Sequence, residues 1–284
     1  MHIAHILNPL AEAVVHEVDG QVVHIDVSAY STLRGFTRTR LVRGETRGLD
    51  AALRLLARGS EGEPVAAGLL AAEALSLWQA GLIIVPQERA DAFVPDHCGI
   101  TGNLPDEFAR QRFMLIPQCL TPAATAAVVT HYRALIARRA MQRGDGQSDR
   151  YVMHNDAAGR ILLRALRRMI ERTVGRPIKC SHAYTALYVG GTELPKHTDR
   201  EQCEYTLSLQ LDYRPMPEEG PSPWPLQLFV SPAAPPLDVL LPIGGGLLFR
   251  GREVPHSRPL LTDDNSCWML LLHYVDADFP GPLG

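Results

Sequence analysis

The chain has 284 residues, of which 46% are hydrophobic and 6% aromatic, and its formal net charge is −3. This length and apolar content can bury one large core, or a core plus a small second domain. The near-neutral charge gives no electrostatic basis for nucleic-acid binding, and no apolar run is long enough to span a bilayer. We therefore expect neither a nucleic-acid nor a membrane partner.

The cysteines and the first residues bear on the cellular compartment. The five cysteines are odd in number and form no Cys-x-x-Cys pair, so the sequence predicts neither a disulfide framework nor a zinc site. The N-terminal residues lack the basic lead of a signal peptide, and Glu12 interrupts their apolar run. We expect a protein of the reducing cytoplasm.

Residues 1–105 are predicted to form a small α+β region. Strands over 13–18 and 21–27 flank Asp19-Gly20, a preferred two-residue hairpin loop. Two helices and a buried strand are expected next, followed by a linker: a helix over 49–58 with a stop at Gly59, a helix from Pro64 to Gly81, a strand over 82–85 and the linker over 86–105. The role of this region stays open, and support for the second domain is favoured over a module that presents peptides.

Two amphipathic helices open the second region, residues 106–284. Thr121-Pro122 combines an N-cap with proline at the first helical position, and helical spacing of apolar residues continues to Ile136. Asp156 is a second N-cap, for a helix that ends at Gly175. The polar connection over 141–151 is either an ordinary link between helices or a lid whose Arg150, Tyr151 or neighbouring Asn155 contacts a substrate.

The rest of the chain is a series of short strands. The segment 183–189 is β-branched and aromatic and ends at Gly190-Gly191, and 205–213 alternates with period two, which places its leucines on one face. Further strands are predicted over 225–230, 238–243, 246–249, around 256 and over 267–275. Short strands separated by glycine, proline and acidic turns favour a sandwich or barrel over a parallel sheet.

The pattern His-x-Asp, which can supply two metal ligands, occurs three times. The copy at His24 and Asp26 lies in an alternating strand whose polar residues are expected to face water, and no partner histidine follows it in a similar setting. In the copy at His154 and Asp156, the aspartate is better explained as a helix cap. Only His197 and Asp199 are flanked on both sides by strand-like segments.

A third candidate ligand is His256, in the segment Val-Pro-His-Ser-Arg that begins at 254, and it follows His197 by 256 − 197 = 59 residues. Two histidines and one carboxylate form the facial triad of non-haem Fe(II) enzymes, which leaves coordination positions open for substrate chemistry. A single His-x-Asp arises by chance, but the joint order of strand, Gly-Gly turn, ligand pair, strands and distal histidine favours a metal site.

From 184 to 275 this order resembles the Fe(II)/2-oxoglutarate-dependent oxygenases, specifically their prolyl-hydroxylase-like branch. The resemblance implies an α+β fold with a double-stranded β-helix (jelly-roll, cupin-like) core, supporting helices and the small N-terminal α+β region. It implies iron at His197, Asp199 and His256. It also implies that Tyr188 reaches the cosubstrate, although this tyrosine could equally be a wall residue whose hydroxyl finds a backbone partner.

The chain departs from this family at the start of its last strand. The family usually places an arginine or lysine there to hold the distal carboxylate of 2-oxoglutarate, whereas residues 263–269 contain no cation. We predict Arg258 as the substitute, because two positions beyond His256 on an extended segment its side chain projects to the same side. A plain surface charge at Arg258 is given similar weight, and Arg250, Arg252 and Lys196 are weaker candidates.

The resemblance implies an Fe(II)- and 2-oxoglutarate-dependent dioxygenase that hydroxylates an unactivated carbon of an amino acid, peptide or natural-product intermediate. Succinate and CO2 are the co-products, and ascorbate is an optional reductant. Desaturation or ring formation uses the same ligands. Two alternatives remain: a cupin-type iron enzyme that does not use 2-oxoglutarate, and a non-catalytic binding protein on the same barrel. His182 and His273, both in apolar strands, are interpreted as core histidines. Oligomeric state is left open.

Overall fold

A computed structural model describes residues 5–45, 48–58, 69–85, 88, 94–95 and 99–284. The chain divides into two compact units, Met1–Phe93 and Val94–Gly284. The boundary predicted at 105 falls inside helix α3 (Leu104–Gln111), which packs against helix α5 (Ala157–Val174) of the second unit. Much of the predicted linker lies outside the described residues. None of the helices that the structure describes combines the length and the apolar character needed to cross a membrane.

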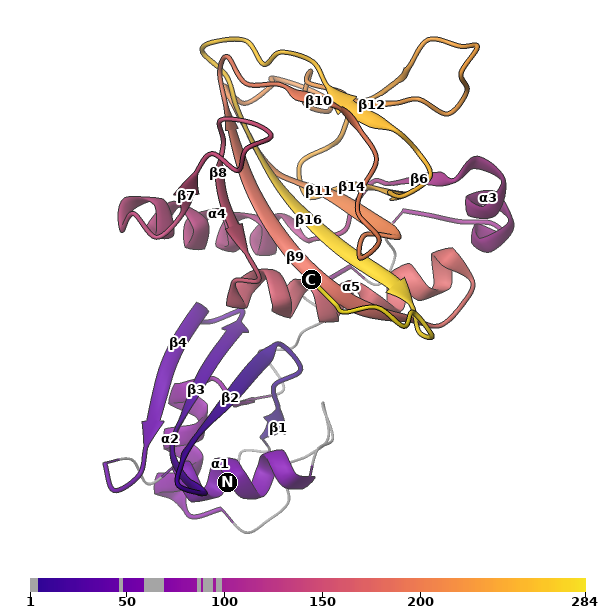
Figure 1. The fold of residues 1–284 in the computed structure, drawn as a ribbon. Helices are drawn as coiled ribbons and strands as arrows, with labels where there is room; N and C mark the ends of the chain where they lie inside the picture. The colour runs from indigo at the N-terminus through magenta and orange to yellow at the C-terminus, as the bar shows by residue number, and fades with distance from the viewer. Residues whose placement is uncertain (1–4, 46–47, 59–68, 86–87, 89–93, 96–98) are drawn as a thin grey trace. The chain divides into compact units, whose positions relative to one another are not determined.

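The first unit is built on a three-stranded antiparallel sheet in the order β2-β3-β4, drawn in indigo and violet in Figure 1. Asp19 and Gly20 both have positive φ, 51° and 74°, as the predicted Asp-Gly hairpin requires. The elements of this unit are β1 Ile6–Leu7, β2 Ala11–Val18, β3 Gln21–Ser31, β4 Gly35–Val42, α1 Leu49–Arg58, α2 Ala71–Ala80 and β5 Ile83–Ile84.

One face of that sheet and the two helices share an apolar core centred on Ile25, Val27 and Leu77, all fully buried. Helix α2 ends at Gly81, as predicted, because this residue takes the left-handed conformation (φ 80°) of a C-cap. The predicted helix start at Pro64 and the stop at Gly59 lie outside the described residues.

The second unit contains a seven-stranded sheet in the order β6-β14-β11-β16-β9-β8-β7, with every neighbouring pair antiparallel. Its long central strands match the segments predicted at 183–189, 205–213 and 267–275. The bounds are β6 Phe113–Ile116, β7 Gln142–Arg143, β8 Tyr151–His154, β9 Ile178–Val189, β11 Tyr205–Arg214, β14 Gly246–Arg250 and β16 Ser266–Asp276.

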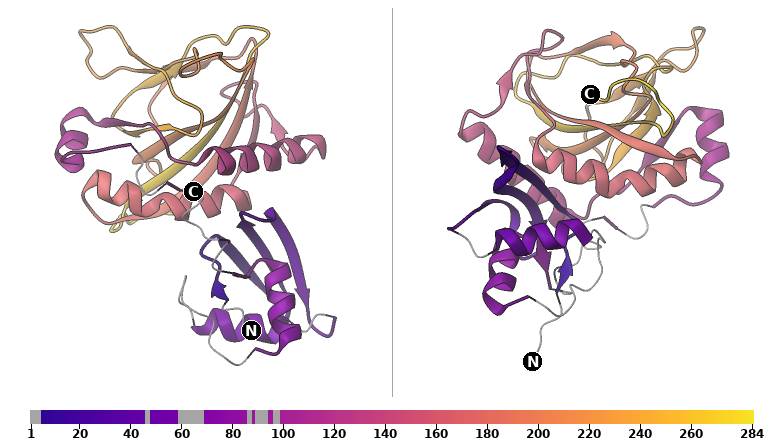
Figure 2. Two further views of the ribbon diagram at one scale, coloured as in Figure 1. Left: turned by 180° about the vertical axis from the view of Figure 1, so that it is seen from behind. Right: turned by 60° about the horizontal axis from the view of Figure 1, so that its bottom comes forward.

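A smaller antiparallel sheet, in the order β10-β15-β12-β13, faces the large one, as Figures 1 and 2 show. Side chains from both sheets, among them Tyr188, Leu228 and Phe249, share one buried core. Two of its strands are shorter than predicted, and the bounds are β10 Leu194–His197, β12 Leu226–Leu228, β13 Leu237–Val239 and β15 His256–Arg258. The unit is thus α+β and mainly antiparallel, as the strand series indicated.

Helices α4 (Pro122–Ala137) and α5 cover the outer face of the seven-stranded sheet (Figure 2). Both start as predicted: Thr121 Oγ1 accepts from the backbone N–H of Ala124 at 3.2 Å, and the Asp156 carboxylate accepts from that of Ala158 at 2.9 Å. Helix α5 ends at Gly175, as predicted. These helices leave the inner face of the sheet free to line a cavity.

Strand β11 shows how the two faces differ. Leu207 and Leu209 are fully buried, as their alternation predicted, yet the polar residues between them, Thr206 and Ser208, are also only 2% exposed. In an ordinary half-buried strand such polar positions would face water. Here they line an internal cavity, so the alternation separates an apolar core face from a polar cavity face.

Candidate metal centre and cavity

The two remote segments that carry His197 and His256 are neighbouring strands. His197 ends β10 and His256 begins β15, and the antiparallel register places these two residues directly opposite each other. Their ring centroids are 4.3 Å apart. Asp199 follows β10 by two residues, and its backbone N–H donates to the carbonyl of Gly251 at 2.9 Å. The structure thus brings all three predicted ligands together.

The donor atoms of these three residues converge. His197 Nε2 lies 3.8 Å and His256 Nε2 lies 3.7 Å from Asp199 Oδ1, and one donor atom from each residue fits within 4.8 Å of the others. Bonds of about 2.0–2.2 Å from a transition metal to nitrogen and oxygen hold adjacent donors about 3–4 Å apart. The spacing therefore fits a single ion between the three side chains.

Hydrogen bonds to the far nitrogens orient both imidazoles. His197 Nδ1 lies 2.8 Å from the carbonyl of Pro195, and His256 Nδ1 lies 3.0 Å from that of Val254. Because a carbonyl only accepts, each Nδ1 carries a hydrogen and each Nε2 presents its lone pair to the common point. Burial lowers the pKa of His256, which keeps this imidazole in the neutral form that binds metals.

Asp199 is held from a second side by groups that sequence reasoning missed. Thr206 Oγ1 donates to Asp199 Oδ2 at 2.6 Å. A Cβ atom added at Gly251 would lie only 2.2 Å from Asp199 Oδ2 and 2.7 Å from Thr206 Oγ1, so glycine is required there for the loop to approach the carboxylate. Thr206 could have been found from its place on the polar face of an alternating strand, whereas nothing local marks Gly251.

The three candidate ligands open onto a cavity of about 370 Å³ between the two sheets. Its volume lies in the range of small-molecule sites. Cations, tyrosines and polar groups line it alongside the ligands, including Arg150, Tyr184, Tyr188, Arg200, Thr206 and Arg258. The cavity therefore combines a cluster of metal-binding groups with positive charge.

Arg258 projects into this cavity, in agreement with the direction predicted from its spacing to His256. It is 3% exposed, and its guanidinium donates to the carbonyl of Trp224 at 3.4 Å and to the sulfur of Met269 at 3.5 Å. Its centre lies 4.7 Å from the Trp224 ring. No carboxylate of the residues that the structure describes pairs with it. Burial lowers the pKa of Arg258, and such a poorly compensated buried cation favours binding of an anion.

The surroundings of the last strand, β16, show how Arg258 can replace the basic residue expected at the start of that strand. In β16, Cys267 and Met269 belong to the apolar core that the two sheets share, and Cys267 is paired with Tyr188 of β9 across the sheet. Arg258 reaches from β15 toward this same part of β16, because its guanidinium contacts Met269. The start of β16 has no cationic residue of its own. Arg258, from the smaller sheet, brings a positive charge to the same place.

Tyr188 is fully buried on β9, and its hydroxyl accepts a hydrogen bond from Arg150. The residues around Arg150 fold over the cavity: Arg150 pairs with Asp145 at 2.7 Å, and Tyr184 donates to the same carboxylate. Although burial opposes ionisation, the hydrogen bonds from Tyr184 and Arg150 lower the pKa of Asp145 to about 2. The polar connection is therefore a cavity wall held by an ion pair between buried Arg150 and partly buried Asp145, and of its candidate residues Arg150 lines the cavity.

The other two His-x-Asp copies have different surroundings. Asp156 caps α5, as predicted, while His154 lies at the cavity edge, 4.4 Å from the Tyr184 ring. Asp26 accepts two hydrogen bonds from Arg40, at 2.7 and 3.1 Å. Its neighbour His24 has a cross-strand partner, His16, which precedes it in the chain. In the His24/Asp26 copy, the carboxylate of Asp26 is thus paired with Arg40.

Comparisons with known proteins concern the fold. Searches against protein families and curated proteins find no match to this sequence. Among solved structures, a Pseudomonas putida prolyl-4-hydroxylase is similar over 61% of this chain and 97% of its own, with 19% identity and a TM-score of 0.50. The non-heme alpha ketoglutarate dependent carbocyclase SnoK, from nogalamycin biosynthesis, is similar over 65% and 87%, with 15% identity and a TM-score of 0.52.

A Trichoplax adhaerens prolyl hydroxylase, in complex with a hypoxia inducible factor peptide, is similar over 61% of this chain and 88% of its own, with 16% identity and a TM-score of 0.51. At such identities the likeness is one of fold. The chain has the fold of the 2-oxoglutarate- and Fe(II)-dependent oxygenases, prolyl hydroxylases among them, and in this respect the predicted resemblance is confirmed.

Proposed function

We propose that the protein is an Fe(II)- and 2-oxoglutarate-dependent dioxygenase that hydroxylates an unactivated carbon. In this proposal the two facing sheets are a double-stranded β-helix, and His197, Asp199 and His256 hold the iron. The observation that carries the proposal is the convergence of these three donors beside a buried arginine that pairs with no carboxylate of the described residues. When bound, iron and 2-oxoglutarate supply the oxidising chemistry, with succinate and CO2 as co-products.

The chain's own residues supply binding and orientation. The two Nε2 lone pairs and Asp199 Oδ1 would hold the ion, and a triad of this kind would leave coordination positions free for substrate chemistry. Arg258 binds the distal carboxylate of 2-oxoglutarate by paired hydrogen bonds, for which its planar guanidinium is suited. Tyr188 and Arg150 form the adjoining cavity wall, and Trp224 packs against both Tyr188 and Arg258.

The substrate is proposed to be an amino acid, a peptide or a natural-product intermediate. Structures with this fold include a prolyl hydroxylase in complex with a peptide and a carbocyclase from nogalamycin biosynthesis. The polar cavity face of β11 and the arginines around it suit a substrate that carries hydrogen-bonding or anionic groups. Because β-helix walls of this kind serve many substrates, the fold does not narrow the choice further.

The test is an anaerobic titration of the protein with Fe(II) and then with 2-oxoglutarate. We expect one tight Fe(II) equivalent and a weak visible charge-transfer band when 2-oxoglutarate chelates the ion. His197→Ala should abolish the band and succinate formation in the presence of oxygen and ascorbate. The exposed Arg143→Ala is a matched control and should change neither. Iron binding without any effect of 2-oxoglutarate would favour a cupin-type iron enzyme instead.

A further inference from the structure

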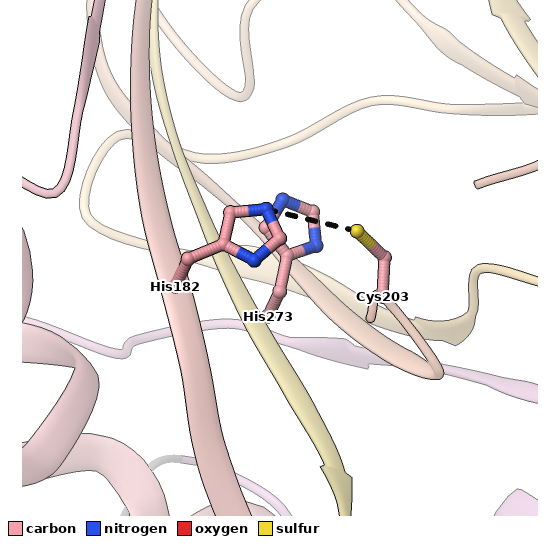
Figure 3. Close-up of side chains that lie close together, drawn as sticks. All are labelled: His182, Cys203 and His273. Carbon is pink, nitrogen blue, oxygen red and sulfur yellow. Dashed lines mark hydrogen bonds between the residues drawn. The ribbon is translucent and has the colours of Figure 1, made fainter. Parts of the chain in front are cut away.

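A second group of metal-binding side chains lies in the same cavity (Figure 3). His182 on β9 and His273 on β16 are cross-strand partners, and Cys203 lies just before β11. These residues are 2%, 5% and 4% exposed, respectively. One donor atom from each fits within 4.8 Å of the others. The group is distinct from His197, Asp199 and His256 and shares no residue with them.

The spacing within this group suits a bound ion. Cys203 Sγ lies 3.8 Å from His182 Nε2, and the rings of His182 and His273 are stacked with centroids 4.4 Å apart. Zinc binds sulfur at about 2.3 Å and imidazole nitrogen at about 2.0–2.1 Å, which at tetrahedral to trigonal angles separates the two atoms by about 3.5–3.8 Å. The sulfur–nitrogen distance is at the upper end of that range, and without an ion it is that of a weak sulfur hydrogen bond (Figure 3).

The hydrogen bonds around His273 leave its second nitrogen available. The single hydrogen of the Thr206 hydroxyl is donated to Asp199, so Thr206 Oγ1 accepts from His273 Nδ1, 3.0 Å away. His273 Nε2 therefore keeps its lone pair.

We propose that His182, Cys203 and His273 form a second metal site, which binds a zinc-like divalent ion through two imidazoles and one thiolate. Three protein ligands leave a fourth position open toward the cavity, as in zinc sites that exchange a water or a substrate donor. As the sulfur–metal bond forms, the Cys203 thiol loses its proton to solvent, and no electron is transferred. The proposal does not depend on iron at the first site.

Some charges around the site oppose a bound cation and others favour it. Arg200 lines the cavity near both histidines, and its positive charge opposes a cation. Asp199 is near enough to Cys203 for its negative charge to help raise the pKa of the thiol, after burial, to about 12. The negative charge of Asp199 favours a cation, and the thiolate that forms on binding adds a second negative charge. The competing interpretation is a neutral, hydrogen-bonded cluster that binds no ion.

Cobalt(II) distinguishes these interpretations, because a thiolate ligand produces a sulfur-to-cobalt charge-transfer band that a site of nitrogen and oxygen ligands lacks. We expect the full chain to bind two cobalt equivalents and to show this band. Cys203→Ser should lose the band and one equivalent, because the site would lose its only sulfur ligand. Cys267→Ser changes another buried cysteine and is the matched control, which should keep the band.

Further variants separate the two sites. His197→Ala should lose the first equivalent and keep the sulfur band. His182→Gln should lose the band, and this variant provides the test if Cys203→Ser does not fold. A wild-type protein that binds cobalt without the band would overturn the second site while leaving the first intact. Retention of the band in Cys203→Ser would do the same, because another sulfur would then be the ligand.

Discussion

Arg258 is the side chain on which binding of the proposed cosubstrate most depends. It is buried, and among the described residues it has no carboxylate partner. A charged hydrogen-bonded contact contributes about 1.5–3 kcal/mol, which corresponds to roughly 10- to 150-fold in affinity. We therefore expect Arg258→Ala to weaken 2-oxoglutarate binding by that factor, measured by titration of the Fe(II) protein. Arg258→Lys should recover part of it, and Arg252→Ala should have no effect.

Thr206 acts on the proposed iron ligand through one hydrogen bond. Its hydroxyl donates to Asp199 Oδ2 at 2.6 Å and leaves Oδ1 directed at the two histidines. Loss of such an outer partner typically lowers metal affinity by about 10- to 100-fold. We expect Thr206→Val to weaken Fe(II) binding by this amount and Thr206→Ser to restore it. Equal affinity in Thr206→Val and the wild type would show that the loop at Gly251 suffices to orient the carboxylate.

At the scale of elements, the alternating faces of the central strands explain the site. On β16, Trp268 stacks on Tyr132 of α4 and Tyr274 donates to the carbonyl of Leu163 in α5, while His273 lines the cavity. Period-two geometry sends neighbouring side chains to opposite faces. A strand covered by helices on one side can therefore present reactive groups on the other without exposing either face to bulk water.

The wall formed by residues 144–150 should depend on pH through Asp145. The folded-state pKa of about 2 lies below the unfolded value of 3.8, so this carboxylate stabilises the fold fully above pH 4 and loses its effect as the pH falls toward 2. We expect the unfolding free energies of the wild type and Asp145→Asn to differ most above pH 4 and to converge near pH 2. Chemical denaturation at a series of pH values measures this difference.

Asp149→Asn is the control for that experiment. Asp149 pairs with Arg143, but both side chains are more than half exposed, and exposed ion pairs contribute little. We expect its unfolding free energy to follow that of the wild type at every pH. The assignment of the Arg150–Asp145 pair would be contradicted by the opposite result. In that result the difference in unfolding free energy from the wild type would disappear near pH 2 for Asp149→Asn but not for Asp145→Asn.

At the scale of the whole molecule, the described residues include an apolar core cluster within each unit. Ile25 is fully buried in the first and Leu247 in the second. A large-to-small substitution in a core costs about 2–5 kcal/mol. We expect Ile25→Ala to lower only the unfolding transition of the first unit and to leave Fe(II) affinity unchanged, whereas Leu247→Ala should lower the other transition. Calorimetry checks this, and one transition that shifts equally in both variants would contradict it.

Local patterns were sufficient to predict much of this protein. Caps such as Thr121 and Asp156, the Asp19-Gly20 hairpin and the alternation of β11 act over a few residues, so their structures follow from neighbours in the chain. The same holds for the direction of Arg258 relative to His256, since two residues on one strand share a face. The order of strands around His197 and Asp199 was enough to indicate the oxygenase fold.

Only the tertiary structure decided which distant groups meet. Thr206, Gly251 and the pair of His182 with His273 depend on strand register, which is set by pairing between segments far apart in the chain. The absence of a carboxylate from the described surroundings of Arg258 is likewise a property of packing. Sequence motifs encode short-range geometry, whereas burial and charge compensation arise only when remote side chains share one cavity.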